Sequence, residues 1–257
     1  MFQWEWFEQV TDMGLIPESD AQLNDLHDSI VQAFPLLGIE GLSHFACNAN
    51  IEDDKGTLDY LEECAQEAKL ETCFIAIEDI GIDELGRFTD LDDRIIKTLI
   101  KLYPWEWIMT ENFGHHVPAS GVQFIEPPWK VILSNKGLMP LLWEMFEGHP
   151  NLLPAYFEDD PAASALVNSG NYVRKPLLSR QGANIEIIRN AETNYKSDGP
   201  YNEGVNIIQD FHPLPEYEGC YPLVGCWLVA SKAVGLGIRE DRTIVTSKDS
   251  HFVPHII

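Results

Sequence analysis

The feature of the sequence that most constrains the fold is a change in the pattern of apolar residues near residue 172. Before it, GLSHFACN, GTLDYLEECAQEAKL and TCFIAIED read as a strand, a helix and a strand, and this crossover length suits parallel pairing. After it, YVRKPLL, NIEIIRN, VNIIQDF, PLVGCWLVAS and RTIVTS read as successive strands joined by turns. The sequence therefore predicts an α+β fold, in which an α/β segment precedes a mostly antiparallel sheet.

Further helices are predicted on either side of the first strand pair. Residues 1–12 carry apolar side chains at three-residue intervals. Ser19 and Gln22 resemble a capping box ahead of an amphipathic helix that should stop near Pro35. RIIKTLIKLY predicts another helix. WKVILSNKGLMPLLWEMF is apolar with helical character, and we expect Pro140 to kink or divide it.

The charge balance limits the possible partners. The chain of 257 residues has 17 Lys and Arg against 41 Asp and Glu, a formal net charge of −24. Nucleic-acid binding needs a basic face, so this class of function is not expected. Such a field attracts a cationic partner such as a polyamine, although it is also what a merely solubilising surface would give.

Cysteine usage and hydropathy bear on the compartment. Five cysteines form no CxxC pair, which argues against a disulfide framework and a zinc finger and favours a reducing compartment. No uncharged apolar stretch is long enough to span a bilayer, and the first residues lack the basic start of a signal peptide. We therefore expect a cytoplasmic protein that does not bind membranes.

Two lysines are candidate ligands for an anion. If YVRKPLL is a strand, Val173, Lys175 and Leu177 share its inward face, where a lysine is costly without an anion. Lys136 in SNKG would be an ordinary loop lysine alone, but together with Lys175 it could hold a polyphosphate from two sides. The alternative is that the strand period is misread and Lys175 is exposed.

Common nucleotide motifs do not explain such a site. The chain has no P-loop, GxGxxG or GxSxG motif, so a nucleotide would have to bind by another route. The turn SRQGAN offers backbone N–H groups near Gly182, which suits phosphate or carboxylate oxygens. Arg239 in GLGIRED stands beside two acidic residues, where a weak surface ion pair is the alternative to a role in binding.

Several long segments resemble one family. YPWEW, EPPWKVILSNKGLMPLLWEMFEGHPNLLPAYF, YVRKPLLSRQGANI and GIRED resemble the synthetase domain of glutathionylspermidine synthases, and most closely its synthetase-only relatives described as acid–amine ligases. The resemblance implies an ATP-grasp fold with lobes of about 1–125 and 126–257. It also implies ATP and Mg²⁺ as cofactors, and an acyl phosphate through which a glutathione-like carboxylate is joined to a polyamine-like amine.

The resemblance also implies roles for individual residues. Lys136 and Lys175 match the lysines that contact ATP phosphates, and Arg180 matches an arginine of a mobile loop over the active site. Arg239 matches an arginine near the acyl-acceptor pocket. The remaining matches are Gly182 and Asn184 in the same loop and, near adenine, Gln209, Asp210, Phe211 and His212.

The chain departs from the family pattern in two respects. The family's metal-binding motifs, Arg-x-Asp and Glu-Tyr-Asn-Ala-Asp, are absent, and GRFTD (86–90) lies in the wrong place to replace them. We therefore expect a C-terminal portion of a longer synthetase that is inactive alone, with its Mg²⁺ ligands upstream of Met1. Trp107 replaces a small hydroxyl residue near glutathione, which leaves the substrate open. A non-catalytic nucleotide-binding fragment or subunit, or a purely structural fragment, is the alternative function.

Overall fold

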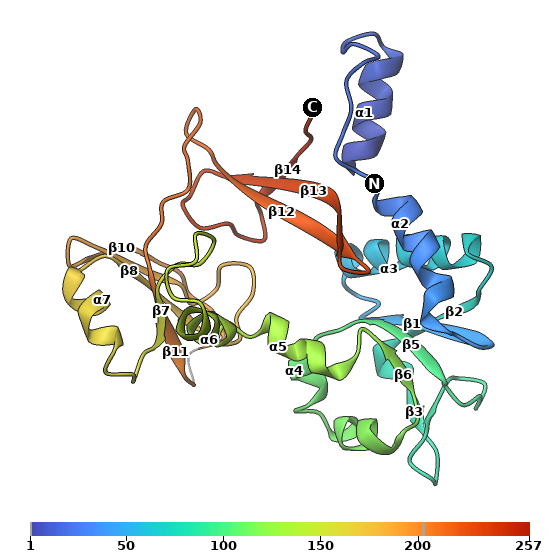
Figure 1. The fold of residues 1–257 in the computed structure, drawn as a ribbon. Coiled ribbons are helices and arrows are strands. Elements are labelled where there is room, and N and C mark those ends of the chain that lie inside the picture. Colours follow the sequence, from blue (N-terminus) through green and yellow to red (C-terminus); the bar gives the residue numbers. More distant parts are fainter. Residues whose placement is uncertain (1, 202–203) are drawn as a thin grey trace. The chain divides into compact units, whose positions relative to one another are not determined.

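The structure is a computed structural model that describes residues 2–201 and 204–257 (Figure 1). The chain divides into two compact units, and each is made of more than one segment. Unit 1 comprises Met1–Gln22, Ile132–Gly225 and Leu236–Ile257, and unit 2 comprises Leu23–Val131 and Cys226–Gly235. The division into lobes of about 1–125 and 126–257 stays a prediction.

Unit 2 is built on a parallel sheet in the order β2-β1-β5-β6. Its strands are β1 (Leu42–Cys47), β2 (Glu71–Ala76), β5 (Thr98–Leu102) and β6 (Gln123–Ile125). Helix α3 (Glu52–Glu67) connects β1 to β2, which pair in parallel as the sequence predicted. Apolar clusters cover both faces of the sheet, one of them with α2 (Leu26–Ala33) and α3 (Figure 1).

The prediction of a helix in RIIKTLIKLY is wrong, because its second half is strand β5. Residues Thr98, Leu99, Ile100 and Lys101 are all buried, since both faces of this strand are covered. A strand buried on both faces loses the alternation of apolar and polar residues that marks a half-exposed strand. Lys101 is accommodated by donating to the Tyr103 carbonyl at 2.8 Å.

The start of α2 also differs from the prediction. Asp25 is its N-cap and makes no side-chain capping bond, so Ser19 and Gln22 form no capping box there. Gln22 lies in unit 1 instead, where its amide donates to the carbonyls of Gln3 and His255. The helix ends as expected, with η1 (Phe34–Leu37) leading to a left-handed Gly38.

Several short elements lie between and after these strands, as far as residue 134. They are η2 (Ile77–Asp79), β3 (Gly81–Ile82), β4 (Phe88–Thr89), α4 (Trp105–Ile108), η3 (Asn112–Ala119), η4 (Pro128–Lys130) and α5 (Val131–Ser134). The antiparallel pair β3 and β4 leads into a turn at Asp90, where the carboxylate accepts hydrogen bonds from the backbone N–H groups of Asp92 and Arg94.

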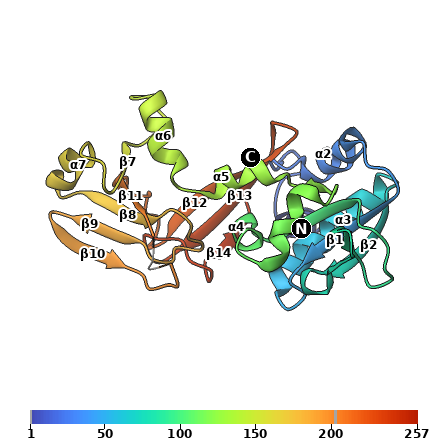
Figure 2. The same cartoon turned by 90° about the horizontal axis from the view of Figure 1, so that it is seen from below.

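Unit 1 contains a five-stranded antiparallel sheet in the order β10-β9-β8-β11-β7 (Figure 2). Its strands are β7 (Ala155–Phe157), β8 (Tyr172–Pro176), β9 (Glu186–Arg189), β10 (Glu192–Lys196) and β11 (Asn206–Asp210), and its helices are α1 (Phe2–Asp12), α6 (Leu138–Met145) and α7 (Ala163–Ser169). The predicted strands in YVRKPLL, NIEIIRN and VNIIQDF are confirmed. The predicted helix over 1–12 is confirmed for Phe2–Asp12, and residue 1 lies outside the described residues.

The apolar segment after Pro127 is divided, but not at Pro140. The break falls at residues 135–137, between α5 and α6. Pro140 occupies the first turn of α6, where a missing N–H removes no helical hydrogen bond. The turn is held by Asn135, whose Oδ1 accepts a hydrogen bond of 2.8 Å from the backbone N–H of Gly137.

A third sheet has the order β12-β13-β14, with β12 (Tyr221–Val229), β13 (Lys232–Asp241) and β14 (His251–Val253). The predicted strand in RTIVTS is wrong, because residues 242–247 form a loop between β13 and β14. Asp241 organises this loop: its carboxylate accepts from the Thr243 backbone N–H at 3.0 Å and from the Ser250 hydroxyl at 2.6 Å. These hydrogen bonds hold the pKa of Asp241 far below its ordinary value.

Candidate functional site

The two lysines singled out from the sequence line one cavity of unit 1, of about 240 Å³. Lys136 comes from the turn before α6 and Lys175 from β8. Gln209 of β11 adds an amide, and Leu133, Met139 and Ile207 contribute apolar walls. Among the described residues that line this cavity, none carries a carboxylate. The cavity therefore concentrates positive charge in an otherwise acidic chain.

Lys175 reaches this cavity because of its register in the sheet. It pairs with Ile207 of β11, and Val173 pairs with Gln209, so these four side chains share one face. The predicted inward orientation of Lys175 beside the buried Val173 is confirmed. Lys175 Nζ donates to Gln209 Oε1 at 2.7 Å. A neutral amide thus holds the ammonium group without cancelling its charge.

Burial and a like charge both act on Lys175. Burial disfavours its ammonium form and, together with the nearby charge of Lys136, lowers its pKa to about 8. An anion in the cavity would reverse both effects, because it would compensate the charge and replace the lost hydration. Binding of an anion by Lys136 and Lys175 stays a prediction.

Lys136 connects the cavity to the loop of residues 178–184. Its backbone N–H donates to the Leu177 carbonyl at 2.9 Å, and its ammonium group donates to the carbonyl and hydroxyl oxygens of Ser179 at 2.7 and 2.9 Å. The sequence did not predict the contact of Lys136 with Ser179, because no sequence signal marks it. A ligand that attracts Lys136 would act on the loop through the same ammonium group.

Arg174 points to the other face of β8 and does not serve the cavity. Its guanidinium makes two hydrogen bonds to the carboxylate of Glu158. Asn206 also donates to Glu158, at 2.9 Å. Arg174 is therefore engaged within the sheet.

The loop of residues 178–184 contacts the loop that Asp241 organises. Gly182 has a φ of +74°, and a Cβ at this position would lie 2.8 Å from both the Thr246 carbonyl oxygen and Val245 Cγ1. The carbonyl of Gly182 accepts from the Ser197 hydroxyl at 2.6 Å. The loop therefore contacts both backbone and side-chain atoms of its neighbours. Its mobility, and the role of Arg180 within it, stay predictions.

Arg239 lies on β13 and is not among the residues that line the lysine cavity. Its Nη2 donates to the Ser247 carbonyl at 2.8 Å, and its Cζ lies 5.0 Å from the ring centroid of Phe252. Its Nε is buried and, among the described residues, has no hydrogen-bond partner. Ser247 directly follows Thr246, so Arg239 and Gly182 contact the same loop. The predicted role of Arg239 near an acyl acceptor stays a prediction.

Of the four residues predicted to meet adenine, only Gln209 lines the cavity. Asp210 pairs with Tyr172 at the end of β11, and Phe211 packs on an apolar cluster with Arg189 stacked at 5.0 Å from its ring. His212 is exposed. The adenine contact itself stays a prediction.

Two lysines and the amide of Gln209 thus line one cavity beside an antiparallel sheet, without a carboxylate among its described lining residues. The whole chain, residues 1–257, matches the glutathionylspermidine synthase preATP-grasp family, and the chain belongs to it. This agrees with the resemblance inferred from the sequence motifs, and the parallel and antiparallel sheets confirm the predicted mixed fold.

Three curated relatives show the same similarity. The "putative acid–amine ligase" of Haemophilus influenzae is 37% identical over 98% of this chain. Trypanothione synthetase of Crithidia fasciculata is 28% identical over 86% of the chain, and the bifunctional glutathionylspermidine synthetase/amidase of Escherichia coli is 28% identical over 77%. The chain spans 65%, 37% and 35% of the lengths of these relatives, respectively. The expectation that it is inactive alone finds no support in these matches.

Among solved structures, a D-cycloserine synthetase matches with a TM-score of 0.44 and 14% identity, over 84% of this chain and 75% of that one. Within the described part of the chain, no helix combines the length and the apolar character needed to cross a membrane.

Proposed function

We propose that this chain carries the nucleotide-binding site of an ATP-dependent acid–amine ligase, in which Lys136 and Lys175 bind phosphate oxygens of ATP. The observation that carries the proposal is the pair of lysines in one cavity without a lining carboxylate. At about 240 Å³ the cavity is smaller than the roughly 300–1,000 Å³ of a complete small-molecule pocket, so it suits the phosphate part of the nucleotide.

The reaction requires charge compensation more than a covalent catalyst. A carboxylate oxygen of the acid attacks the γ-phosphorus of ATP, which gives an acyl phosphate and releases ADP. The amine nitrogen then attacks the acyl carbon, the C–O bond to phosphate breaks, and an amide and phosphate are formed. Ammonium groups at fixed positions stabilise the charge on the transferred group. Lys136 and Lys175 would supply this stabilisation, and Arg180 would approach from the loop that Lys136 contacts.

The substrates are proposed from two observations. The family's name contains glutathionylspermidine, an amide of an acidic peptide and a polyamine. A net charge of −24 attracts a polyamine to the molecule and repels other anions, which then need a local positive site. A glutathione-like acid and a polyamine-like amine therefore fit the chain best.

Mg²⁺ would accompany ATP in the expected chemistry and would supply positive charge to the phosphates. Mg²⁺ is usually held by one or two carboxylates together with phosphate oxygens. The described residues that line the cavity of Lys136 and Lys175 include no carboxylate, so they fit the phosphates and not the metal. We assign no catalytic step to a metal ligand of this cavity.

The proposal is tested by assaying the purified chain with ATP, magnesium, glutathione and spermidine. We expect ADP and amide to form together, and Lys136→Ala to lower the yield of both. ATP binding without amide formation would favour the alternative, a nucleotide-binding chain without catalysis. Amide formation that Lys136→Ala and Lys175→Ala leave unchanged would show that the site lies elsewhere.

A further inference from the structure

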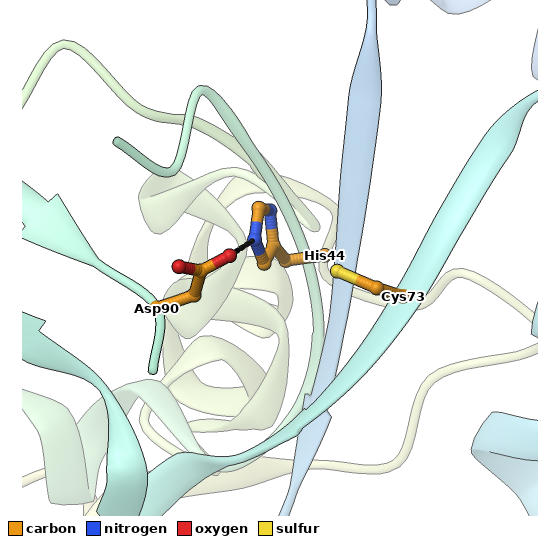
Figure 3. A group of neighbouring side chains, drawn as sticks. All are labelled: His44, Cys73 and Asp90. Carbon is orange, nitrogen blue, oxygen red and sulfur yellow. Dashed lines mark hydrogen bonds and ion pairs between the residues drawn. The ribbon is translucent and has the colours of Figure 1, made fainter. Parts of the chain in front are cut away.

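A histidine, a cysteine and an aspartate, whose side chains are of types that ligate metals, lie close together in unit 2 (Figure 3). His44 of β1 and Cys73 of β2 are direct partners in the parallel register, so both project from the same face of the sheet. Asp90 follows β4 and approaches that face. One potential ligand atom from each residue lies within 4.8 Å of the other two.

His44 is deeply buried and its hydrogen bonding is incomplete. Only 1% of the residue is exposed. Its Nε2 lies 3.0 Å from Asp90 Oδ2, whereas its Nδ1 has no hydrogen-bond partner among the described residues. Without an ion, the carboxylate of Asp90 accepts the proton of Nε2. An ion that binds Nε2 shifts this proton to Nδ1, where no hydrogen-bond donor among the described residues opposes it.

Asp90 is fixed in place before any ion binds. Its Oδ1 accepts from the backbone N–H groups of Asp92 and Arg94, at 3.0 and 2.9 Å. Its Oδ2 accepts from Arg94 Nε at 2.7 Å in addition to His44. Arg94 in turn contacts the carboxylate of Asp92 at 3.0 Å. The carboxylate is therefore already oriented, as metal-binding carboxylates usually are.

We propose that His44, Cys73 and Asp90 bind a divalent transition-metal ion of the zinc class. Nitrogen, sulfur and oxygen donors together suit Zn²⁺, whereas Mg²⁺ and Ca²⁺ take oxygen ligands. The ion takes the place of the proton between Nε2 and Oδ2. Zinc bonds of about 2.0–2.2 Å to nitrogen and oxygen separate the two ligand atoms by roughly 3.3 Å, close to the 3.0 Å observed.

Charge and access agree with a divalent ion. Asp90, Asp92 and a deprotonated Cys73 carry three negative charges, and Arg94 carries one positive charge, so a divalent ion neutralises the group. Cys73 has to rotate toward the imidazole, and its thiol proton is released to solvent when the ion binds. Cys73 is partly exposed, so the ion can enter from that side and water can occupy a fourth position.

The experiment uses the full chain, titrated with Co²⁺ as a spectroscopic substitute for Zn²⁺. We expect one ion per chain and the absorption of a sulfur-to-cobalt bond. Cys73→Ser should remove that absorption and weaken binding by about 10- to 100-fold or more. Cys226→Ser, which changes an exposed cysteine elsewhere, should leave both unchanged. No stoichiometric binding, or an absorption that Cys73→Ser retains, would overturn the proposal.

A second measurement uses the unchanged chain and so does not depend on how a variant folds. Alkylation of each cysteine is followed by peptide mass spectrometry, with and without Zn²⁺. We expect Zn²⁺ to protect Cys73 at least tenfold and to leave Cys226 reactive. Equal alkylation of Cys73 in both conditions would show that the hydrogen-bonded pair of His44 and Asp90 and the neighbouring Cys73 bind no ion.

Discussion

Lys175 Nζ donates a hydrogen bond of 2.7 Å to Gln209 Oε1 across neighbouring strands of the antiparallel sheet. The two residues are diagonal neighbours on one face, because Gln209 pairs directly with Val173. A carboxylate in place of the amide would neutralise the lysine. The glutamine positions the lysine and leaves its charge available to a ligand.

ATP binding should weaken as pH rises. In the free chain the pKa of Lys175 is about 8, so the ammonium group loses its proton above that pH. Affinity should therefore fall between about pH 7 and about pH 9.5, and binding should take up a proton near pH 8. Calorimetric titrations across this range measure both. The arginine of Lys175→Arg stays charged across this range, so the ATP affinity of this variant should depend much less on pH. An equally weak pH dependence for the unchanged chain would contradict the contact between Lys175 and ATP.

Lys175→Met should stabilise the free chain at neutral pH. The pKa of Lys175 in the folded chain lies below its unfolded value of about 10.4. Burial of the protonated side chain therefore lowers the free energy of unfolding. The penalty is full below about pH 8 and disappears as pH rises toward about 10.4. We expect a gain of about 1–3 kcal/mol at pH 7 from urea unfolding. Lys232→Met, at an exposed position, is the control and should change little.

Asp241→Asn should loosen the loop of residues 242–250. The carboxylate accepts hydrogen bonds from Thr243, Ser247 and Ser250, and an amide cannot accept them all. The pKa of Asp241 is lowered by folding, so its stabilisation is present above the unfolded value of about 3.9 and is lost as pH falls below it. We expect a loss of about 1 kcal/mol at pH 7 and faster amide exchange in the loop. A stability difference between the unchanged chain and Asp241→Asn that persists undiminished at acidic pH would contradict this explanation.

Gly182→Ala should disrupt the contact between the two loops of unit 1. The new Cβ would lie 2.8 Å from the Thr246 carbonyl oxygen, in addition to the strain of a φ of +74°. Gly148→Ala is a matched control, with a φ of +78° and nothing within 4 Å of its Cβ. We expect protease cleavage near Arg180 to accelerate several-fold more in the first variant. Equal effects would mean that the Thr246 contact contributes nothing beyond backbone strain.

The sequence predicted elements whose pattern is local. The inward position of Lys175 followed from the alternation in YVRKPLL, and the parallel pair β1 and β2 followed from strand and crossover lengths. The β5 strand was read as a helix because burial on both faces removed its alternation. The RTIVTS segment has strong strand formers, but hydrogen bonds to Asp241 hold it as a loop.

Contacts between distant residues could not be predicted in the same way. Ser179 contacts Lys136 across 43 positions, and Gly182 lies against Thr246, which is also distant in the sequence. His44, Cys73 and Asp90 are also far apart in the sequence and have no metal-site spacing. Their proximity results from strand register and from one turn, neither of which a motif search reports.

The most direct test of the central claim is ATP affinity at about pH 7 for the unchanged chain and three lysine variants, Lys136→Ala, Lys175→Ala and Lys232→Ala. Loss of a charge-assisted contact to phosphate costs about 1.5–3 kcal/mol, so we expect the first two variants to bind at least tenfold more weakly. The third should bind as the unchanged chain does, because its lysine is exposed and outside the cavity. Equal affinities for all four proteins would contradict a nucleotide site at Lys136 and Lys175.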